Sequence, residues 1–150
     1  MAKDSEFTQR LNDFVADCAG KIAEDAVTAA REAGIYHNQT GNLRSSIGAA
    51  VVRDGRIINQ PGFEQYTGAD GDGAKGLQAG KQYLKDVAAD ISEPPGTTTI
   101  VVTAGMDYAG YVEDCGLDVL RTAEVVTERA IDDFANVLGD FLTDEIADQL

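Results

Sequence analysis

The sequence predicts an α+β domain: a small antiparallel sheet with the N-terminal and C-terminal helices packed on one face. Three observations indicate this fold class. Apolar residues recur at helical spacing near both ends of the chain, an Asp-Gly pair separates two short strand-like runs, and Thr97–Ala104 is dominated by β-branched residues. The chain has 150 residues, 43% of them hydrophobic, which suits a single folded domain.

A long helix is expected over Ser5–Ala33. Its apolar residues lie one, three or four positions apart, so they share one face of a helix. They are Phe7, Leu11, Phe14, Val15, Cys18 and Ile22. Asp4 or Ser5 can cap the start of this helix, and Gly34 is a natural stop.

A β-hairpin is expected next. Ile47–Val52 consists of small and β-branched residues, and Arg56–Asn59 forms the return strand. Between them Asp54-Gly55 makes a strong two-residue turn, because Asp and Gly tolerate the positive φ that such a turn requires.

The span 60–80 contains six glycines and is predicted to be a loop that is mobile in the free protein and ordered by a partner. A helix is expected to start around Leu77 and to end at Glu93-Pro94-Pro95-Gly96, because proline cannot continue a helix. The strand Thr97–Ala104 follows.

The C-terminal third is expected to contain a turn and a short helix within Gly105–Gly116, and then a short strand over Gly116–Leu120. A long helix is predicted from about Arg121 to Ala147. Its apolar residues again repeat at intervals of three and four, which is the spacing of one helix face.

The composition argues against several classes of partner. Acidic residues number 26 against 12 basic ones, and the net charge is −14. A chain of this charge is repelled by phosphate backbones, so no sequence-specific nucleic-acid binding is expected. The charge itself can serve solubility, line a surface past which DNA moves without sticking, or reflect adaptation to high salt. No apolar run approaches the ~20 residues of a membrane-spanning helix, and the polar N-terminus is not that of a secretory leader.

No constellation for catalysis, cofactor or metal binding emerges. His37 is the only histidine, and nothing places Ser45 or Ser46 at a catalytic spacing from it. The span Asp70–Gly73 looks like a calcium loop, but the oxygen ligands and the glycine that an EF-hand needs further along are missing. Cys18 and Cys115 form no motif and are interpreted as small buried hydrophobes, with their pairing left open.

Two segments resemble one known family of proteins. Gln39-Thr40-Gly41-Asn42-Leu43-Arg44-Ser45-Ser46-Ile47 resembles the TGxLRxSI segment of small neck and tail-completion proteins of tailed bacteriophages. Asp107-Tyr108-Ala109-Gly110-Tyr111-Val112-Glu113, with Gly116, resembles their YAxYVExG segment. In that family the first segment lies between an N-terminal helix and a β-hairpin, and the second lies between a strand and a C-terminal helix. Cys115 places the glycine one position later than in the tightest form of the motif, and the glycine-rich stretch resembles an insertion.

The resemblance implies a structural virion subunit that works in head–tail joining or tail completion by forming a homo-oligomeric ring. Its partners would be copies of itself and neighbouring neck or tail proteins, with no small-molecule substrate, in the virion and in the host cytoplasm during assembly. Head–tail connector, tail terminator and minor tail component all stay open. The alternatives are a small acidic binding or regulatory protein, such as a nucleic-acid mimic or a host-directed phage factor, and a small hydrolase.

Candidate interface residues come from the two segments and from the hairpin. They are Thr40, Gly41, Leu43, Arg44, Arg53, Arg56, Tyr108, Tyr111, Glu113 and Gly116. Thr40 and Gly41 belong to a turn, Leu43 can anchor on the core, and Arg44 can pair with a carboxylate. Tyr108 and Tyr111 share one face of a helical turn and can pack internally or anchor an interface.

The charges are unevenly spread along the sequence. Asp107–Leu150 holds twelve acidic and two basic residues, whereas Tyr36–Gln60 holds three arginines and one aspartate. A basic hairpin and an acidic helix would give a head-to-tail ring complementary surfaces. This hypothesis predicts that reversing Arg53 and Arg56 to Glu leaves the monomer folded and weakens self-association, most at low salt.

Overall fold

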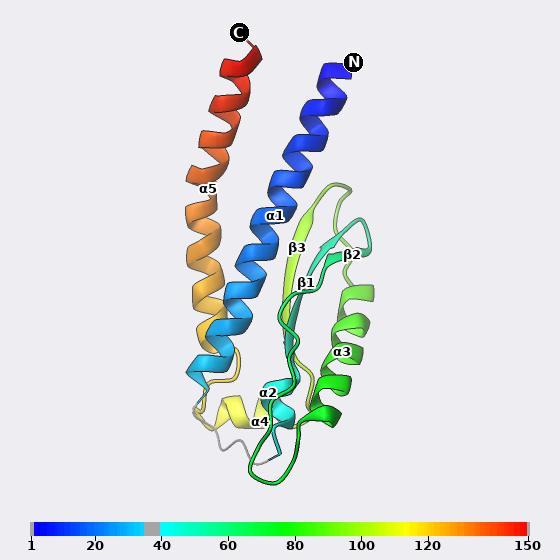
Figure 1. The fold of residues 1–150 in the computed structure, drawn as a ribbon, viewed down its shortest axis with the longest axis vertical. Coiled ribbons are helices and arrows are strands. Elements are labelled where there is room, and N and C mark those ends of the chain that lie inside the picture. The colour runs from blue at the N-terminus through cyan, green and yellow to red at the C-terminus, as the bar shows by residue number, and fades with distance from the viewer. Residues whose placement is uncertain (1, 35–39, 150) are drawn as a thin grey trace.

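The protein is an α+β structure built around a three-stranded sheet (Figure 1). The computed structural model describes residues 2–34 and 40–149. The elements are α1 (Ala2–Ala33), α2 (Asn42–Ser45), β1 (Ile47–Arg53), β2 (Arg56–Asn59), α3 (Ala74–Ala89), β3 (Thr98–Ala104), α4 (Ala109–Asp114) and α5 (Arg121–Gln149). The predicted fold class, the two strands of the predicted hairpin and the predicted strand near the middle of the chain are confirmed.

The sheet is antiparallel in the order β2-β1-β3. β1 and β2 meet at the predicted turn, where Asp54 and Gly55 have φ of 53° and 77°. The side chain of Asp54 also accepts a hydrogen bond from the Gly96 N–H at 2.9 Å, which ties this turn to the approach of β3. The pairing of β1 with β2 passes from Val51↔Asn59 to Val52↔Ile57, so Ile58 is an extra residue in β2, a β-bulge.

Helices cover both faces of the sheet (Figure 1). On one face the alanines of α1, with Val27, pack on Ile47, Ala49 and Val51 of β1. On the other face Leu84 and Ala88 of α3 pack on Ala50 and Val52. Six of the seven residues of β1 are buried because both faces of this strand are covered, and its sequence is accordingly apolar without alternation.

α5 runs antiparallel to α1 and packs against it, and the ends of both helices extend beyond the sheet (Figure 1). Near the start of α5, Ala123 is buried in the hydrophobic core that α1 forms with β1. Further along, the Phe14 ring stacks on Phe141 and Phe134 at centroid distances of 4.3 and 6.4 Å. We call the outer parts of these helices, residues 5–14 and 134–148, the helical arm.

Three local expectations are wrong. α1 begins at Ala2, so neither Asp4 nor Ser5 caps its start. α3 begins at Ala74 and not around Leu77, so part of the expected loop is helical. Residues 116–120 form no strand; this segment makes the turn between α4 and α5, whose stabilisation is described below.

The early start of α3 follows from its glycines. A Cβ at Gly76 would lie 2.0 Å from the Asn42 carbonyl oxygen, and a Cβ at Gly80 would lie 2.4 Å from the Ser46 carbonyl oxygen. The two glycines are four residues apart and let α3 rest directly on the backbone of α2. The glycine-rich sequence therefore serves close packing at these positions; the mobility expected for the span 60–80 stays a prediction.

Candidate assembly surfaces

The first of the two motif segments is bound to its neighbours at almost every residue. Gly41 has φ of 77°, and a Cβ there would lie 1.9 Å from the Tyr66 carbonyl oxygen, so no other residue fits. The Thr40 hydroxyl accepts a hydrogen bond from the Asn42 N–H at 3.2 Å, as predicted for a turn. The Asn42 side chain in turn accepts from the Gly76 N–H at 3.0 Å, which holds the first turn of α3.

The second half of this segment joins three more parts of the chain. Arg44 donates to the Gly34 carbonyl oxygen at 3.0 Å, just after the end of α1. The buried Ser45 hydroxyl accepts from the Tyr66 N–H at 2.7 Å, and the Ser46 carbonyl oxygen accepts from the Gly105 N–H at 3.2 Å. These bonds give the segment a structural role inside the subunit.

Arg31 and Tyr66 lie beside this segment. The buried Arg31 donates to the Ile47 carbonyl oxygen at 2.8 Å, and its guanidinium lies 5.0 Å from the centre of the Tyr66 ring. Burial raises the pKa of the Tyr66 phenol, and its hydrogen bond to Glu64 raises the pKa further. This pair connects the last turn of α1 to the loop that precedes α3.

The second motif segment forms α4 and the start of α5. Gly116 has φ of 79°, and its N–H donates to the Glu113 carbonyl oxygen while the Leu117 N–H donates to that of Val112. This is the Schellman arrangement that ends a helix at a left-handed glycine. The Glu113 carboxylate accepts from the N–H groups of Val119, Leu120 and Arg121 at 2.7–2.9 Å. It thereby caps α5, because Leu120, at the position before the helix, has no polar side chain to do so.

The two motif segments meet in one hydrophobic cluster. Leu43 of the first is buried with Ala109 and Val119, and Val112 and Leu117 pack around them. We call this region, together with the contacts of α2 with α3, the junction. Leu43 is thus an anchor on the core, as predicted. Tyr108 is 42% exposed at the start of α4; the backbone of Tyr111 belongs to α4, and its side chain lies outside the described residues.

The two hairpin arginines differ from each other. Arg53 donates to the Thr98 hydroxyl at 2.8 Å and to the Asn12 carbonyl oxygen at 3.2 Å, so it connects the hairpin to β3 and α1. Arg56 is exposed. Reversing the charge at Arg53 would remove bonds inside the subunit, so it cannot serve as a pure test of self-association, contrary to our expectation from the sequence. Of the candidate interface residues, Thr40, Arg56, Tyr108 and Gly116 are exposed, whereas Arg44, Arg53 and Glu113 are half-buried.

The surface charges separate across the sheet. α5 carries eight acidic residues and two arginines, and all of these acidic residues except Glu145 are exposed. On the opposite face, α3 carries three lysines and one aspartate. Lys81 and Lys85 line a hollow of about 600 Å³ with glutamines 60, 78 and 82. This basic face could not be predicted from the sequence, because it depends on α3 and α5 lying on opposite sides of the sheet.

Other chemistry has little support in the described parts of the chain. Within residues 2–34 and 40–149, no group of three histidine, cysteine or acidic side chains could hold a metal ion. Cys18 and Cys115 are free, and Cys115 is exposed, so its interpretation as a buried hydrophobe is wrong. His37 lies outside the described residues.

No helix in the described ranges is long and apolar enough to cross a bilayer. Comparison with family models, with curated proteins and with solved structures gives no match to this chain.

Proposed function

We propose that this protein is a structural subunit of a tailed bacteriophage or prophage that acts in head–tail joining or tail completion as a homo-oligomeric ring. Its support is the relation between the two segments that resemble this family. Leu43 of the first and Ala109 of the second are 66 positions apart in the sequence, yet they share one cluster. Their elements follow the expected order: helix, first segment, hairpin, and then strand, second segment, helix.

The distribution of charge supports a head-to-tail arrangement. In such a ring each subunit presents two different surfaces to its neighbours. The acidic outer face of α5 and the lysine face of α3 lie on opposite sides of the sheet (Figure 1). Complementary charges of this kind steer association and fix orientation. The basic surface that we propose is therefore that of α3, with Arg56 at its side as a residue to be tested.

The direct test is the mass of the purified protein in solution as a function of salt concentration. We expect a closed oligomer at low salt that dissociates as salt screens the contact. The variant Lys81→Glu with Lys85→Glu is expected to remain folded, since both side chains are exposed, and to lose assembly. Lys21→Glu on the acidic side is the matched control for each single variant, Lys81→Glu and Lys85→Glu, because it makes the same change of charge at an exposed lysine of α1.

Two results would contradict the proposal. One is a monomer or dimer at all protein and salt concentrations; if that species also bound a basic nucleic-acid-binding protein, it would favour the acidic regulatory alternative. The other is equal assembly of the α3 variant and the control. Arg56→Glu separately tests whether the hairpin contributes to the contact.

A further inference from the structure

The strand β3 has a free edge. In the order β2-β1-β3 its other side pairs with no strand in the described parts of the chain. β1 is buried along six of its seven residues, whereas only Thr103 is buried in β3. The free edge is seven residues long and consists of Thr, Ile, Val and Ala. It contains no proline, charge or bulge, the features that usually block further pairing.

The register shows which backbone groups of β3 point outward. The Gly105 N–H donates to the Ser46 carbonyl oxygen, and this pair continues the ladder that joins Ala104 to Ile47. In an antiparallel ladder hydrogen-bonded pairs alternate with non-bonded ones. Positions 99, 101 and 103 therefore bond to β1. The N–H and C=O groups of Thr98, Ile100, Val102 and Ala104 point to the free edge.

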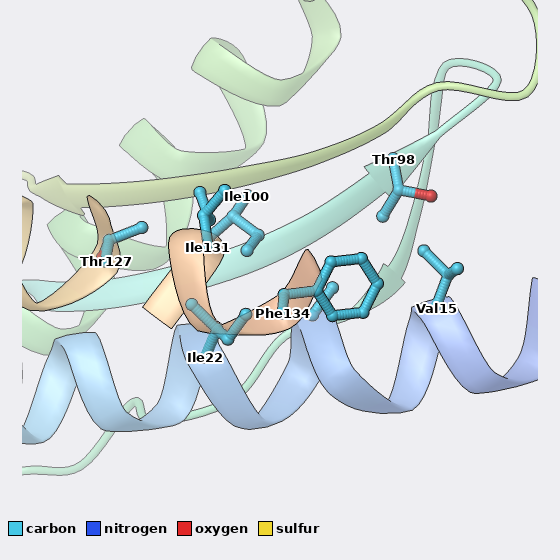
Figure 2. A pocket seen from close by; sticks show the side chains of 8 residues that line it. Val15, Ile22, Thr98, Ile100, Thr127, Ile131 and Phe134 are labelled. Atoms are coloured by element: carbon cyan, nitrogen blue, oxygen red, sulfur yellow. The ribbon is translucent and has the colours of Figure 1, made fainter. Parts of the chain in front are cut away.

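A groove lies beside Thr98, Ile100 and Val102. Its first part is an apolar cavity of about 270 Å³ between α1, α5 and the beginning of β3. Figure 2 shows Val15 and Ile22 of α1, Ile131 and Phe134 of α5, and Ile100 of β3 around one space. α5 thus leaves a gap against β3 that side chains of the protein do not fill.

The second part of the groove has acidic side chains on its wall. It adjoins Val102 and is lined by Glu124 and Glu128 of α5, with Arg121 and the capping Glu113. Thr127 lines both parts, so they follow one another along β3. The groove is therefore largely apolar along β3, and acidic side chains border it near Val102.

The opposite edge of the sheet is protected. β2 has four residues, contains the bulge at Ile58 and carries the exposed Arg56. Short length, a bulge and a charged side chain all discourage pairing with another strand. The contrast indicates that pairing is blocked at one edge and left possible at the other.

We propose that the edge of β3 and its groove bind an extended segment of a partner protein by strand addition. The outward backbone groups of β3 would bond the main chain of that segment. Apolar side chains at alternate positions would enter the first part of the groove, and Lys or Arg side chains would meet Glu124 and Glu128. A second copy of this chain is disfavoured as the occupant, because it carries a net charge of −14 and its own acidic α5 beside the same strand.

This inference does not rest on the proposed function, because it needs only the edge of β3 and its groove and concerns a different partner. Glu124 and Glu128 also belong to the acidic side of α5 that the ring would use, so peptide binding is measured at a salt concentration at which the protein is monomeric. The probe is the synthetic peptide Lys-Thr-Lys-Thr-Val-Thr-Val. When it pairs antiparallel to β3, its lysines lie beside the acidic side chains and its valines lie beside the apolar cavity. Calorimetry is expected to show saturable binding. Hydrogen exchange is expected to slow at the amides of Thr98, Ile100, Val102 and Ala104.

Two controls separate strand addition from other binding. N-methylation of the lysine and valine amides, which face β3, is expected to abolish binding, whereas N-methylation of the threonine amides leaves it unchanged. In the protein, Ile131→Asn is expected to weaken binding at least tenfold, and Val137→Asn is expected to leave it unchanged. These side chains of α5 are 50% and 47% exposed, and only Ile131 lines the groove.

The inference is overturned by absence of saturable binding, or by equal effects of the two methylation patterns. It is also overturned if the free protein dimerises through β3, so that the amides of Thr98, Ile100, Val102 and Ala104 become more protected as protein concentration rises. The mass of the Ile131→Asn variant in solution distinguishes the two proposals. This variant is expected to lose peptide binding and still to assemble, so either proposal can fail without the other.

Discussion

The junction and the helical arm lie at opposite ends of the molecule (Figure 1) and are held together in different ways. At the junction, backbone meets backbone: α3 rests on α2 through Gly76 and Gly80, and a single carboxylate, Glu113, accepts three N–H groups. In the arm, two helices meet through stacked Phe rings and the ion pair Arg10–Glu145, in which Arg10 is exposed and Glu145 is half-buried. The junction therefore tolerates almost no change in shape, whereas the arm depends on side chains that can move and on a charge pair that salt can screen.

The largest expected effect is at Gly76. Gly76→Ala places a methyl group against the Asn42 carbonyl oxygen, so α3 must move from α2, and we expect a loss of about 2 kcal/mol or more in the free energy of unfolding. Gly139→Ala in the arm is the matched control, because nothing lies within 4 Å of its added Cβ. It should gain about 0.5–1 kcal/mol from helix propensity. Urea unfolding measures both, and stabilisation by both would break the comparison.

The next effect is at Glu113. Glu113→Gln keeps the shape of the side chain but leaves weaker and fewer acceptors for the N–H groups at the start of α5, and we expect a loss of about 1–3 kcal/mol. Asp114→Asn removes the same charge from the neighbouring exposed residue and should change stability by less than about 0.5 kcal/mol. Thermal unfolding would compare them; similar losses would mean that charge, and not capping, determines the effect.

A smaller effect is expected for the ion pair in the arm. Glu145 accepts hydrogen bonds from both Nε and Nη2 of Arg10, and this partner raises the pKa of Arg10. Because Arg10 is exposed, salt should screen the pair. A double-mutant cycle of Arg10→Ala and Glu145→Ala should give a coupling below the loss at Glu113 that declines with salt. A coupling energy that does not change with salt would contradict the description of this ion pair as one that solvent ions can screen.

The smallest effect concerns reactivity without any change of sequence. Burial raises the pKa of the Cys18 thiol, so its reactive thiolate forms at higher pH than in the unfolded chain. Cys115, at the end of α4, is exposed. Iodoacetamide at neutral pH should therefore modify Cys115 first, and urea should remove the difference. Mass spectrometry of the two peptides measures this, and faster modification of Cys18 would mean that α1 opens from its neighbours.

The sequence was sufficient for elements that are encoded locally. The periodicity of α1 and α5, the Asp54-Gly55 turn and the β-branched strand β3 were each predicted to within a few residues. The errors concern residues whose role depends on a distant segment. From the sequence alone, Gly76 could indicate a mobile loop or a close packing contact, and only the position of Asn42 against it decides. Similarly, Glu113 can cap α5 only because the chain folds the start of that helix against it. The groove beside β3 could not be predicted either, since it arises where three separate elements meet.

The ion pair between Arg10 and Glu145 joins residues 135 positions apart, and this separation determines when the arm can form. Closing so long a loop has an entropic cost that local contacts do not offset. During synthesis the first helix is complete long before the last helix leaves the ribosome. The apolar face of the first helix, which includes Phe14, therefore stays uncovered by the last helix while the hairpin and most of the junction are already synthesised. We expect the arm to be the last part of the fold to close and the first to open.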